Sequence, residues 1–308
     1  MAKLGKVLLT GGGGFIARNL AEHLQTKYEI FTPLHRELDV LDEEAVGQKI
    51  DEEHIDYVVH CANVGGGRDT LDVPNVAEKN VRMFLNIARN AHRLKRIINL
   101  GSGAEYDVRS YKPQMKEEYF DKHVPIDAYG FSKYVCSKFI LMSPQDMVCL
   151  RLFGVFGKYE KYYLKFISNA IVKNLLGLPI TIKQNVRFDY LSVDDLATVV
   201  EYFLGHRGRY RDYNVVSGEV VDLVSIAALV NSLGDKPFEV RILETGMGKE
   251  YSGDNSRLRA EMKEFKPSPF KDKVSELYEW YKRNLNSIDK DLLRKGDAYI
   301  PLTRTSLT

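Results

Sequence analysis

The chain has few cysteines, no long apolar run and no histidine cluster. Its three cysteines, Cys61, Cys136 and Cys149, are scattered, and each lies within an apolar stretch. Such a set predicts reduced core thiols in the cytoplasm rather than a disulfide framework. No stretch approaches the ~20 uninterrupted apolar residues of a membrane-spanning helix, so we expect no membrane partner. The seven histidines show no ligand spacing, which predicts that no structural metal is bound.

Strong charge is also lacking. The formal net charge of +2 over 308 residues predicts neither nucleic acid nor an anionic membrane as a partner. The first residues lead directly into an apolar strand, without the longer apolar region of a signal peptide, which favours a cytoplasmic protein. With 44% hydrophobic and 28% charged residues, the composition is that of a globular protein. The length suffices for one large domain with a smaller lobe.

Apolar strands and amphipathic helices alternate along the first half of the chain. Regular alternation implies a parallel sheet covered on both faces, and right-handed crossovers then give a doubly wound, Rossmann-type α/β fold. We expect strands at 7–10, 29–32, 57–61, 96–100 and 147–152, and helices at 15–24, 42–50, 75–94 and 128–142.

The rhythm loosens after about residue 153. Further elements expected there are helices at 161–176, 193–204 and 223–233, and strands at 179–182, 188–191 and 238–243. We therefore predict an NAD(P)-binding Rossmann domain at 1–160, a mixed region of returning sheet strands and substrate-binding lobe at 161–283, and a polar C-terminal tail at 284–308.

A glycine-rich turn after the first strand predicts a dinucleotide site. Gly11, Gly14 and Ala17 form a Gly-x-x-Gly-x-x-Ala turn that opens a helix. Glycine lets the backbone approach a pyrophosphate, and free N–H groups at the helix start face its charge. Phe15 and Ile16, the first residues of that helix, belong to the expected cofactor site.

The end of the second strand bears on the choice between NAD and NADP. An acidic residue there bonds the ribose 2′-hydroxyl, whereas basic residues favour a 2′-phosphate. No acid lies at this strand end, and His35 and Arg36 follow it. The pattern favours NADP(H), with NAD(H) as the alternative. If His35 and Arg36 do not bind the cofactor, we expect both on a solvated surface. Asp39 and Asp42 come next, and we expect one of them at the adenine edge.

A serine, a tyrosine and a lysine form the candidate catalytic set. Tyr129 and Lys133 stand four residues apart on an expected helix and so face the same way. The ammonium stabilises the phenolate, so Tyr129 can exchange a proton with an alcohol or a forming alkoxide. Lys133 would also bond the nicotinamide ribose. Ser102 follows the fourth strand, where such sheets bind ligands, and would donate to the substrate oxygen.

Together these motifs resemble the extended short-chain dehydrogenase/reductases, in the nucleotide-sugar epimerase, dehydratase and 4-ketoreductase branch. The resemblance covers roughly residues 6–260. Residues 9–17 resemble the family's Thr-Gly-Gly-x-Gly-Phe-Ile-Gly, residues 60–62 its His-x-Ala, and residues 187–195 its Arg-Asp-Phe-x-x-Val-x-Asp segment.

The resemblance implies further site residues. Cys61, Ala62 and Asn80 match positions of the family's cofactor site. Arg187 would reach the nucleotide diphosphate of the substrate, a role that suits guanidinium geometry, although a surface salt bridge is the alternative. Lys165 lies either in the sugar pocket or on a solvated helix face. Arg257 is a candidate second basic contact.

Departures from the family patterns bear on the reaction. The 4,6-dehydratases that resemble this chain carry Asp-Glu directly after the catalytic serine or threonine, and fucose-synthase-type enzymes carry cysteine at the second position. Here Gly103 and Ala104 stand there and cannot move protons. We therefore expect neither dehydration nor epimerisation beside the ketone.

What remains is chemistry at C4 of a nucleotide-linked sugar. Reduction of a 4-keto-6-deoxy sugar is favoured because His35 and Arg36 suit NADPH. NAD-dependent C4 epimerisation and net C4 oxidation are the alternatives. A non-catalytic dinucleotide-binding protein on the same fold is a further alternative, although Tyr129 and Lys133 are both retained. The helices expected at 75–94 and 128–142 carry more apolar residues than one buried face needs, which predicts a homodimer.

Overall fold

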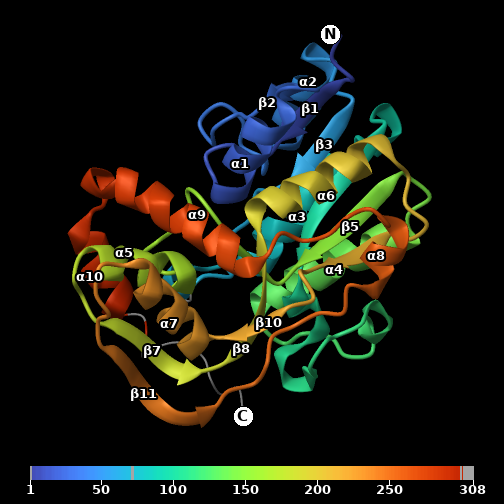
Figure 1. The fold of residues 1–308 in the computed structure, drawn as a ribbon. Helices are drawn as coiled ribbons and strands as arrows, with labels where there is room; N and C mark the ends of the chain where they lie inside the picture. Colours follow the sequence, from blue (N-terminus) through green and yellow to red (C-terminus); the bar gives the residue numbers. More distant parts are fainter. Residues whose placement is uncertain (1, 71–72, 299, 301–308) are drawn as a thin grey trace.

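Six parallel strands form the central sheet of the computed structural model, which describes residues 2–70, 73–298 and 300 (Figure 1). The strands lie in the order β2-β1-β3-β4-β5-β9, and each neighbouring pair is parallel. The order reverses between β1 and β3, where sheets of this type bind ligands at the carboxyl ends of their strands. In this order the strands are Glu29–Phe31, Lys6–Leu9, Tyr57–His60, Arg96–Ser102, Met147–Leu152 and Asp212–Val215.

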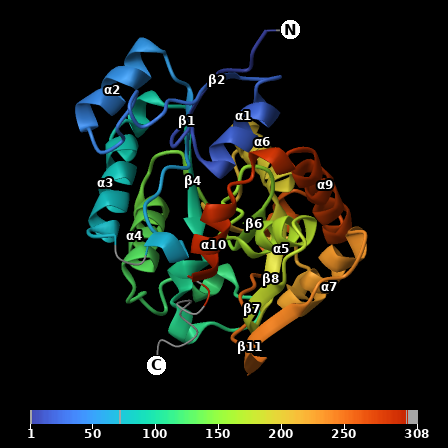
Figure 2. The same cartoon turned by 90° about the vertical axis from the view of Figure 1, so that its left-hand side faces the viewer.

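Helices cover both faces of this sheet, so the predicted doubly wound Rossmann-type fold is confirmed. α1 (Phe15–Leu24) and α6 (Val193–Gly205) pack together on one face. On the other face lie α2 (Glu43–Glu52), α3 (Val76–Ala88) and α4 (Ala128–Met142) (Figure 2). The strands are apolar on both sides because both sides are buried.

The second half of the chain builds a lobe below the carboxyl ends of the strands (Figure 1). Its core is shared by helices and a pair of parallel strands. The helices are α5 (Phe166–Leu175), α7 (Leu223–Leu233), α9 (Phe270–Arg283) and α10 (Lys290–Ala298), and the strands are β7 (Ile180–Asn185) and β11 (Val240–Met247). A three-stranded sheet adds β10 (Val220–Asp222), β8 (Arg187–Ser192) and β6 (Gly154–Phe156), and α8 (Ser256–Glu261) packs on the central sheet.

The lobe differs from expectation in three places. The helix expected from residue 161 begins at Phe166, because residues 161–165 form a turn in which the Lys165 N–H bonds the Lys161 carbonyl. Helix α9 was not predicted. The segment expected as a tail contains α10, which packs on the lobe through the buried side chain of Leu293 and an ion pair between Asp297 and Lys173. Residues 301–308 of the expected tail lie outside the described residues.

The structure also bears on membrane spans, metal sites and the cysteines. Among the described residues, no helix combines the length and apolarity that a bilayer crossing requires, and no group of metal-binding side chains gathers. The three cysteines are free thiols. Burial raises the pKa of Cys61 and of Cys136 to about 12, so neither thiol is a ready nucleophile.

Candidate active site at the carboxyl ends of the strands

The glycine-rich turn lies between β1 and α1 and is open at the helix start. Gly11 has φ +68°, and a Cβ on it would lie 3.0 Å from the Cα of Ala62. A Cβ on Gly12 would collide with the Thr32 carbonyl, so glycine is required at both positions. Within the described chain no side chain caps α1, and no acid lies in its first turn. The first N–H groups of this helix are therefore left for an anion such as a dinucleotide pyrophosphate, which fits here.

Thr10 locks the end of β1 to the end of β3. Its Oγ1 accepts hydrogen bonds from the N–H groups of Cys61 (3.0 Å) and Ala62 (3.1 Å) and lies 2.9 Å from Nδ1 of His60. Because both acceptor positions are filled, the hydroxyl hydrogen goes to Nδ1 and the His60 proton sits on Nε2. Burial, helped by the Lys133 ammonium, lowers the pKa of His60 to about 3, so the ring is neutral.

Asn80 fixes the loop after β3, which lies against Tyr129. Its amide exchanges two 2.8 Å hydrogen bonds with the backbone of Val64 and donates to Oγ of Ser132 (3.1 Å). This loop carries Gly66, at φ +80°, where a Cβ would lie 2.9 Å from Cζ of Tyr129. The amide of Asn80, which we predicted to belong to the cofactor site, is thus used by the protein itself to hold this loop.

The structure brings the three predicted catalytic residues together from one strand and one helix. Ser102 ends β4, and Tyr129 and Lys133 lie on consecutive turns of α4. Nζ of Lys133 donates to the Leu100 carbonyl (2.9 Å) and lies 5.8 Å from the centroid of the Tyr129 ring. Ser102 and Lys133 are each 7% exposed, and Tyr129 is half-buried. An ammonium has three donors, so two remain for other partners.

The backbone around Ser102 is held by a buried charge network. The Ser102 N–H donates to Glu105 (2.9 Å), whose other carboxylate oxygen accepts from Nε of Arg151 (2.5 Å). Arg151 also pairs with Asp212 (2.6 Å) on β9. The first turn of α4 packs directly on this segment, since a Cβ on Gly130 would lie 2.7 Å from the Ala104 carbonyl oxygen. These contacts fix the distance between strand and helix.

The residues after β2 lie beside the glycine-rich turn. His35 and Arg36 occupy an exposed turn, with side chains 84% and 80% exposed. Their nearest carboxylates are loose partners, with Asp39 at 3.8 Å from His35 and Glu37 at 4.0 Å from Arg36. Asp42 instead caps α2 by accepting from the Ala45 N–H (3.0 Å).

The three predicted substrate contacts are placed differently. Arg187 on β8 and Lys165 at the start of α5 are exposed, and among the described residues neither forms an ion pair. Arg257 is engaged by the protein's own carboxylates: Asp212 lies at 2.5 Å and Glu118 at 2.9 Å. The structure therefore gives Arg257 a structural role, and we do not include it in the proposed substrate site.

Two tyrosines that sequence reasoning missed also reach this place. Tyr111 donates to the Gly103 carbonyl (2.9 Å), and a Cβ on Gly103 would lie 2.7 Å from the Tyr251 hydroxyl oxygen. Both tyrosines come from irregular segments without a motif, and Tyr251 is far from Ser102 along the chain. Only the folded arrangement identifies them.

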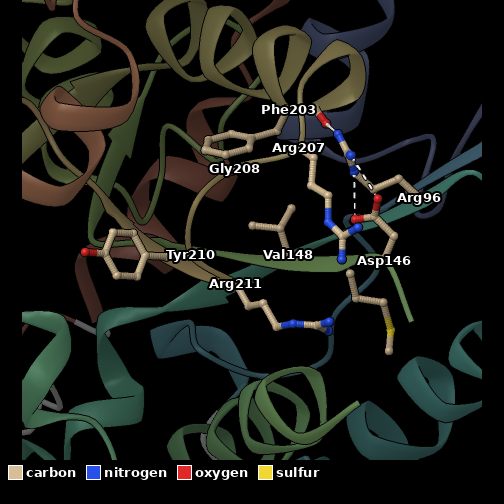
Figure 3. A pocket seen from close by; sticks show the side chains of 9 residues that line it. Arg96, Asp146, Val148, Phe203, Arg207, Gly208, Tyr210 and Arg211 are labelled. Atoms are coloured by element: carbon tan, nitrogen blue, oxygen red, sulfur yellow. Dashed lines mark hydrogen bonds and ion pairs between the residues drawn. The ribbon is translucent and has the colours of Figure 1, made fainter. Parts of the chain in front are cut away.

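A small cavity lies at the amino ends of the strands, opposite the candidate site, and is not part of it (Figure 3). It encloses about 20 Å³ where β4 and β5 begin, whereas Ser102 ends β4. Two of the arginines that line it already have partners: Arg96 is bonded to Asp146 (2.9 Å) and to the carbonyls of Phe203 and His206, and Arg211 donates to the Gln145 carbonyl (2.7 Å). This cavity offers structural ion pairing rather than room for a ligand.

Comparison with known proteins settles the family. The model of the NAD dependent epimerase/dehydratase family matches residues 7–216. The chain belongs to this family. The membership confirms the predicted extended short-chain dehydrogenase/reductase branch and an NAD(P)-dependent enzyme.

Individual relatives are more distant. The chain is 30% identical over 225 residues to GDP-L-colitose synthase of Yersinia pseudotuberculosis, covering 65% of this chain and 72% of the relative. It is 27% identical over 179 residues to dTDP-4-dehydrorhamnose reductase of Aggregatibacter actinomycetemcomitans, covering 57% and 60%. Among solved structures, GDP-mannoheptose C4 reductase from Campylobacter jejuni with NADP bound has a TM-score of 0.79 at 21% identity, covering 92% of this chain and 99% of that one.

Proposed function

We propose that this protein uses NADPH to reduce a ketone at C4 of a nucleotide-linked sugar, most simply a 4-keto-6-deoxy sugar. The observation that carries the proposal is the site around Ser102. Lys133 lies there between the backbone of β4 and the ring of Tyr129, while Gly103 and Ala104 supply no group that could remove a proton from carbon. Two of the relatives are named as reductases, one of them a C4 reductase, which supports this direction.

In such a reduction Tyr129 supplies the proton, and Ser102 and Lys133 stabilise the charge that develops. A bound reduced nicotinamide supplies the hydride. Tyr129 gives its phenolic proton to the oxygen that becomes an alkoxide, and Ser102 donates a hydrogen bond that is strongest when that oxygen carries charge. Lys133, anchored on the Leu100 carbonyl at 2.9 Å, keeps positive charge beside the phenol as the proton leaves. The Gly66 loop covers the tyrosine ring and limits its movement.

The cofactor preference rests on the turn after β2. His35 and Arg36 are exposed, with no close ion pair, next to the segment that packs on the glycine-rich turn. A 2′-phosphate at this edge would gain charge-assisted hydrogen bonds from them. NAD(H) lacks that phosphate, so it would bind here with less affinity.

The substrate contacts proposed are Arg187 for the diphosphate and Lys165 for the sugar side of the pocket. Both side chains are exposed and without an ion pair among the described residues. GDP-linked sugars are the first to test, because GDP-L-colitose synthase and GDP-mannoheptose C4 reductase are among the relatives.

The experiment is a substrate panel. The purified protein is incubated with GDP-, CDP-, UDP- and thymidine-diphosphate-linked 4-keto sugars plus NADPH or NADH, and absorbance of the reduced cofactor is followed. Loss of NADPH matched by formation of the C4 alcohol supports the proposal. A parallel panel uses the corresponding C4-hydroxy sugar nucleotides with NAD or NADP: inversion at C4 without net cofactor change would instead establish a C4 epimerase, and net reduction of the cofactor would establish a dehydrogenase.

We also propose that the enzyme works as a homodimer in the cytoplasm. Helix α4 exposes large apolar side chains, among them Phe139 (41% exposed) and Met142 (75%). Burying such residues against a second copy through α3 and α4 would remove apolar area from water. Light scattering after gel filtration should give twice the chain mass, and Phe139→Glu should shift that mass toward the monomer. A monomeric wild-type protein would contradict this proposal.

A further inference from the structure

An ion pair joins the loop that lies on Tyr129 to the segment that leads into the lobe. Nζ of Lys161 lies 2.7 Å from Oδ2 of Asp69, a residue 92 positions away along the chain. Asp69 belongs to the loop after β3, and Lys161 to the turn before α5. The Asp69 side chain is only 19% exposed, so this pair is more shielded from water than an ordinary surface pair. Two distant segments are therefore tied together beside the candidate active site.

The loop that carries Asp69 lies over the phenol end of Tyr129. A Cβ on Gly66 would lie 2.9 Å from Cζ, 3.0 Å from Cε2 and 3.2 Å from Cε1 of the Tyr129 ring. These similar distances place Gly66 over the part of the ring that carries the hydroxyl group. A Cβ on Gly65 would lie 2.9 Å from Cγ1 of Val76 on α3, so the loop is held closely between α3 and α4. The position of this backbone therefore limits where the phenol can lie.

The loop is fixed on both sides of Gly66. At its start the amide of Asn80 holds it through the two backbone hydrogen bonds described above. Beyond Gly66 it forms a tight turn, in which the N–H and the hydroxyl of Thr70 both donate to the Gly67 carbonyl (3.1 and 2.8 Å). Asp69 lies within this turn, so its ion pair with the lobe positions the turn as a unit.

On the lobe side, the backbone of the same lysine holds the candidate sugar contact. The Lys161 carbonyl accepts hydrogen bonds from the N–H groups of Leu164 (2.8 Å) and Lys165 (3.0 Å). Lys165 then begins α5 as its N-cap residue. The side chain of Lys161 thus binds the loop, while its backbone closes the turn that presents Lys165. A continuous series of contacts runs from Lys165 to the phenol of Tyr129.

We propose that Asp69 and Lys161 are positioning residues whose ion pair holds the Gly66 loop on Tyr129, an inference that rests on the proposed function. With the pair formed, the loop keeps the phenol beside the oxygen that it protonates. Without the pair, the turn is free to leave the lobe, and the phenol samples positions from which proton transfer is slow. The pair itself breaks no bond and moves no proton, so its loss should lower kcat more than it changes KM.

The kinetic test removes the two charges one at a time. Asp69→Asn and Lys161→Met should each slow single-turnover oxidation of bound NADPH by about three- to fivefold, as expected for a partly shielded ion pair, with KM for sugar and NADPH within about twofold. Lys161→Arg keeps the charge and should retain roughly half or more of the wild-type rate. The Lys161 side chain is 55% exposed, so its replacement tests the pair without disturbing the core.

Glu22→Gln is the matched control. It breaks the ion pair between Glu22 and Lys158 (2.7 Å), which ties the same segment to α1 instead of to the loop, and its rate should stay within about 1.5-fold of wild type. The double variant Asp69→Asn/Lys161→Met should be about as slow as either single variant, because both substitutions remove one contact. Multiplied losses in the double variant, or equal rates for Asp69→Asn and Glu22→Gln, would overturn the proposal.

A second measurement does not depend on turnover. With 3-fluorotyrosine in place of Tyr129, the fluorine NMR shift reports the surroundings of the phenol, with and without NADPH. Asp69→Asn and Lys161→Met should each move this resonance, whereas Glu22→Gln should not. If the enzyme reduces no 4-keto sugar, the proposed function fails while this arm still decides the coupling; an unmoved resonance in both variants overturns it.

Discussion

Gly66 is the position where one added methyl group should directly displace Tyr129, the proposed catalytic tyrosine. An alanine at φ +80° carries backbone strain of about 1–2 kcal/mol. Its Cβ would also lie 2.9 Å from Cζ of Tyr129, where ordinary carbon contacts begin near ~3.5 Å. The loop or the ring must therefore shift by roughly half an ångström or more. Because misplacement by ~1 Å can cost ~10²-fold in rate, we expect kcat of Gly66→Ala to fall by one to two orders of magnitude.

Gly246→Ala is a matched control for the backbone strain. Gly246 has φ +81° on β11, and a Cβ there would meet nothing within 4 Å. Both variants should lose Tm by roughly 2–6 °C, as expected for ~1–2 kcal/mol in a chain of this size. Only Gly66→Ala should lose kcat, measured from NADPH oxidation under saturating substrate. A Gly66→Ala enzyme with the kcat of Gly246→Ala would refute the placement of this loop on Tyr129.

Two further predictions concern the cofactor and stability. The double variant His35→Ala/Arg36→Ala should raise KM for NADPH on the order of tenfold, about one lost charge-assisted hydrogen bond, and leave KM for NADH unchanged; equal changes for both would contradict the 2′-phosphate assignment. Burial raises the pKa of Glu160 from 4.5 to about 7, although its carboxylate accepts from Ser168 (2.6 Å). The folded state then binds this proton more tightly, so wild-type stability falls as pH rises through this range. Glu160→Gln should therefore raise Tm relative to wild type at pH 8 and little at pH 5, whereas exposed Glu264→Gln should show no such difference; equal Tm gains at both pH values would refute the burial.

The Rossmann half of the fold was predictable because its signals are local and periodic. The boundaries of α1, α4 and β5 match the expected ranges, and the glycine-rich turn stands where the motif places it. Ser102, Tyr129 and Lys133 were proposed as catalytic residues for the same reason, since each belongs to a motif with fixed spacing. Their convergence then follows from strand and helix geometry.

The lobe was less predictable because tertiary contacts decide its elements. Tyr162 lies before α5 rather than in it, and its hydroxyl is hydrogen-bonded to the backbone of Asp289, far along the chain. Helix α9 did have a readable signal: its buried residues Phe270, Val274 and Leu277 recur at helical spacing. Arg257 was expected at the substrate, but three acidic residues that sequence alone does not place near it hold its guanidinium.

The position of Tyr251 could not be predicted from the sequence. The residue carries no motif, and it reaches Gly103, the residue after Ser102, because β8 binds its backbone and Gly103 leaves space for its hydroxyl. The sequence did show that Gly103, which follows Ser102, leaves space beside it. Only the folded structure shows that Tyr251 fills that space.

The most direct test of the central claim is the reduction of a nucleotide-linked 4-keto sugar by Tyr129→Phe. If Tyr129 delivers the proton to the reduced oxygen, single-turnover oxidation of bound NADPH should slow by about 10²–10⁴-fold, while NADPH binding, followed by fluorescence, should stay within about twofold of wild type. A Tyr129→Phe enzyme that turns over within a few-fold of wild type would contradict the assignment of this site.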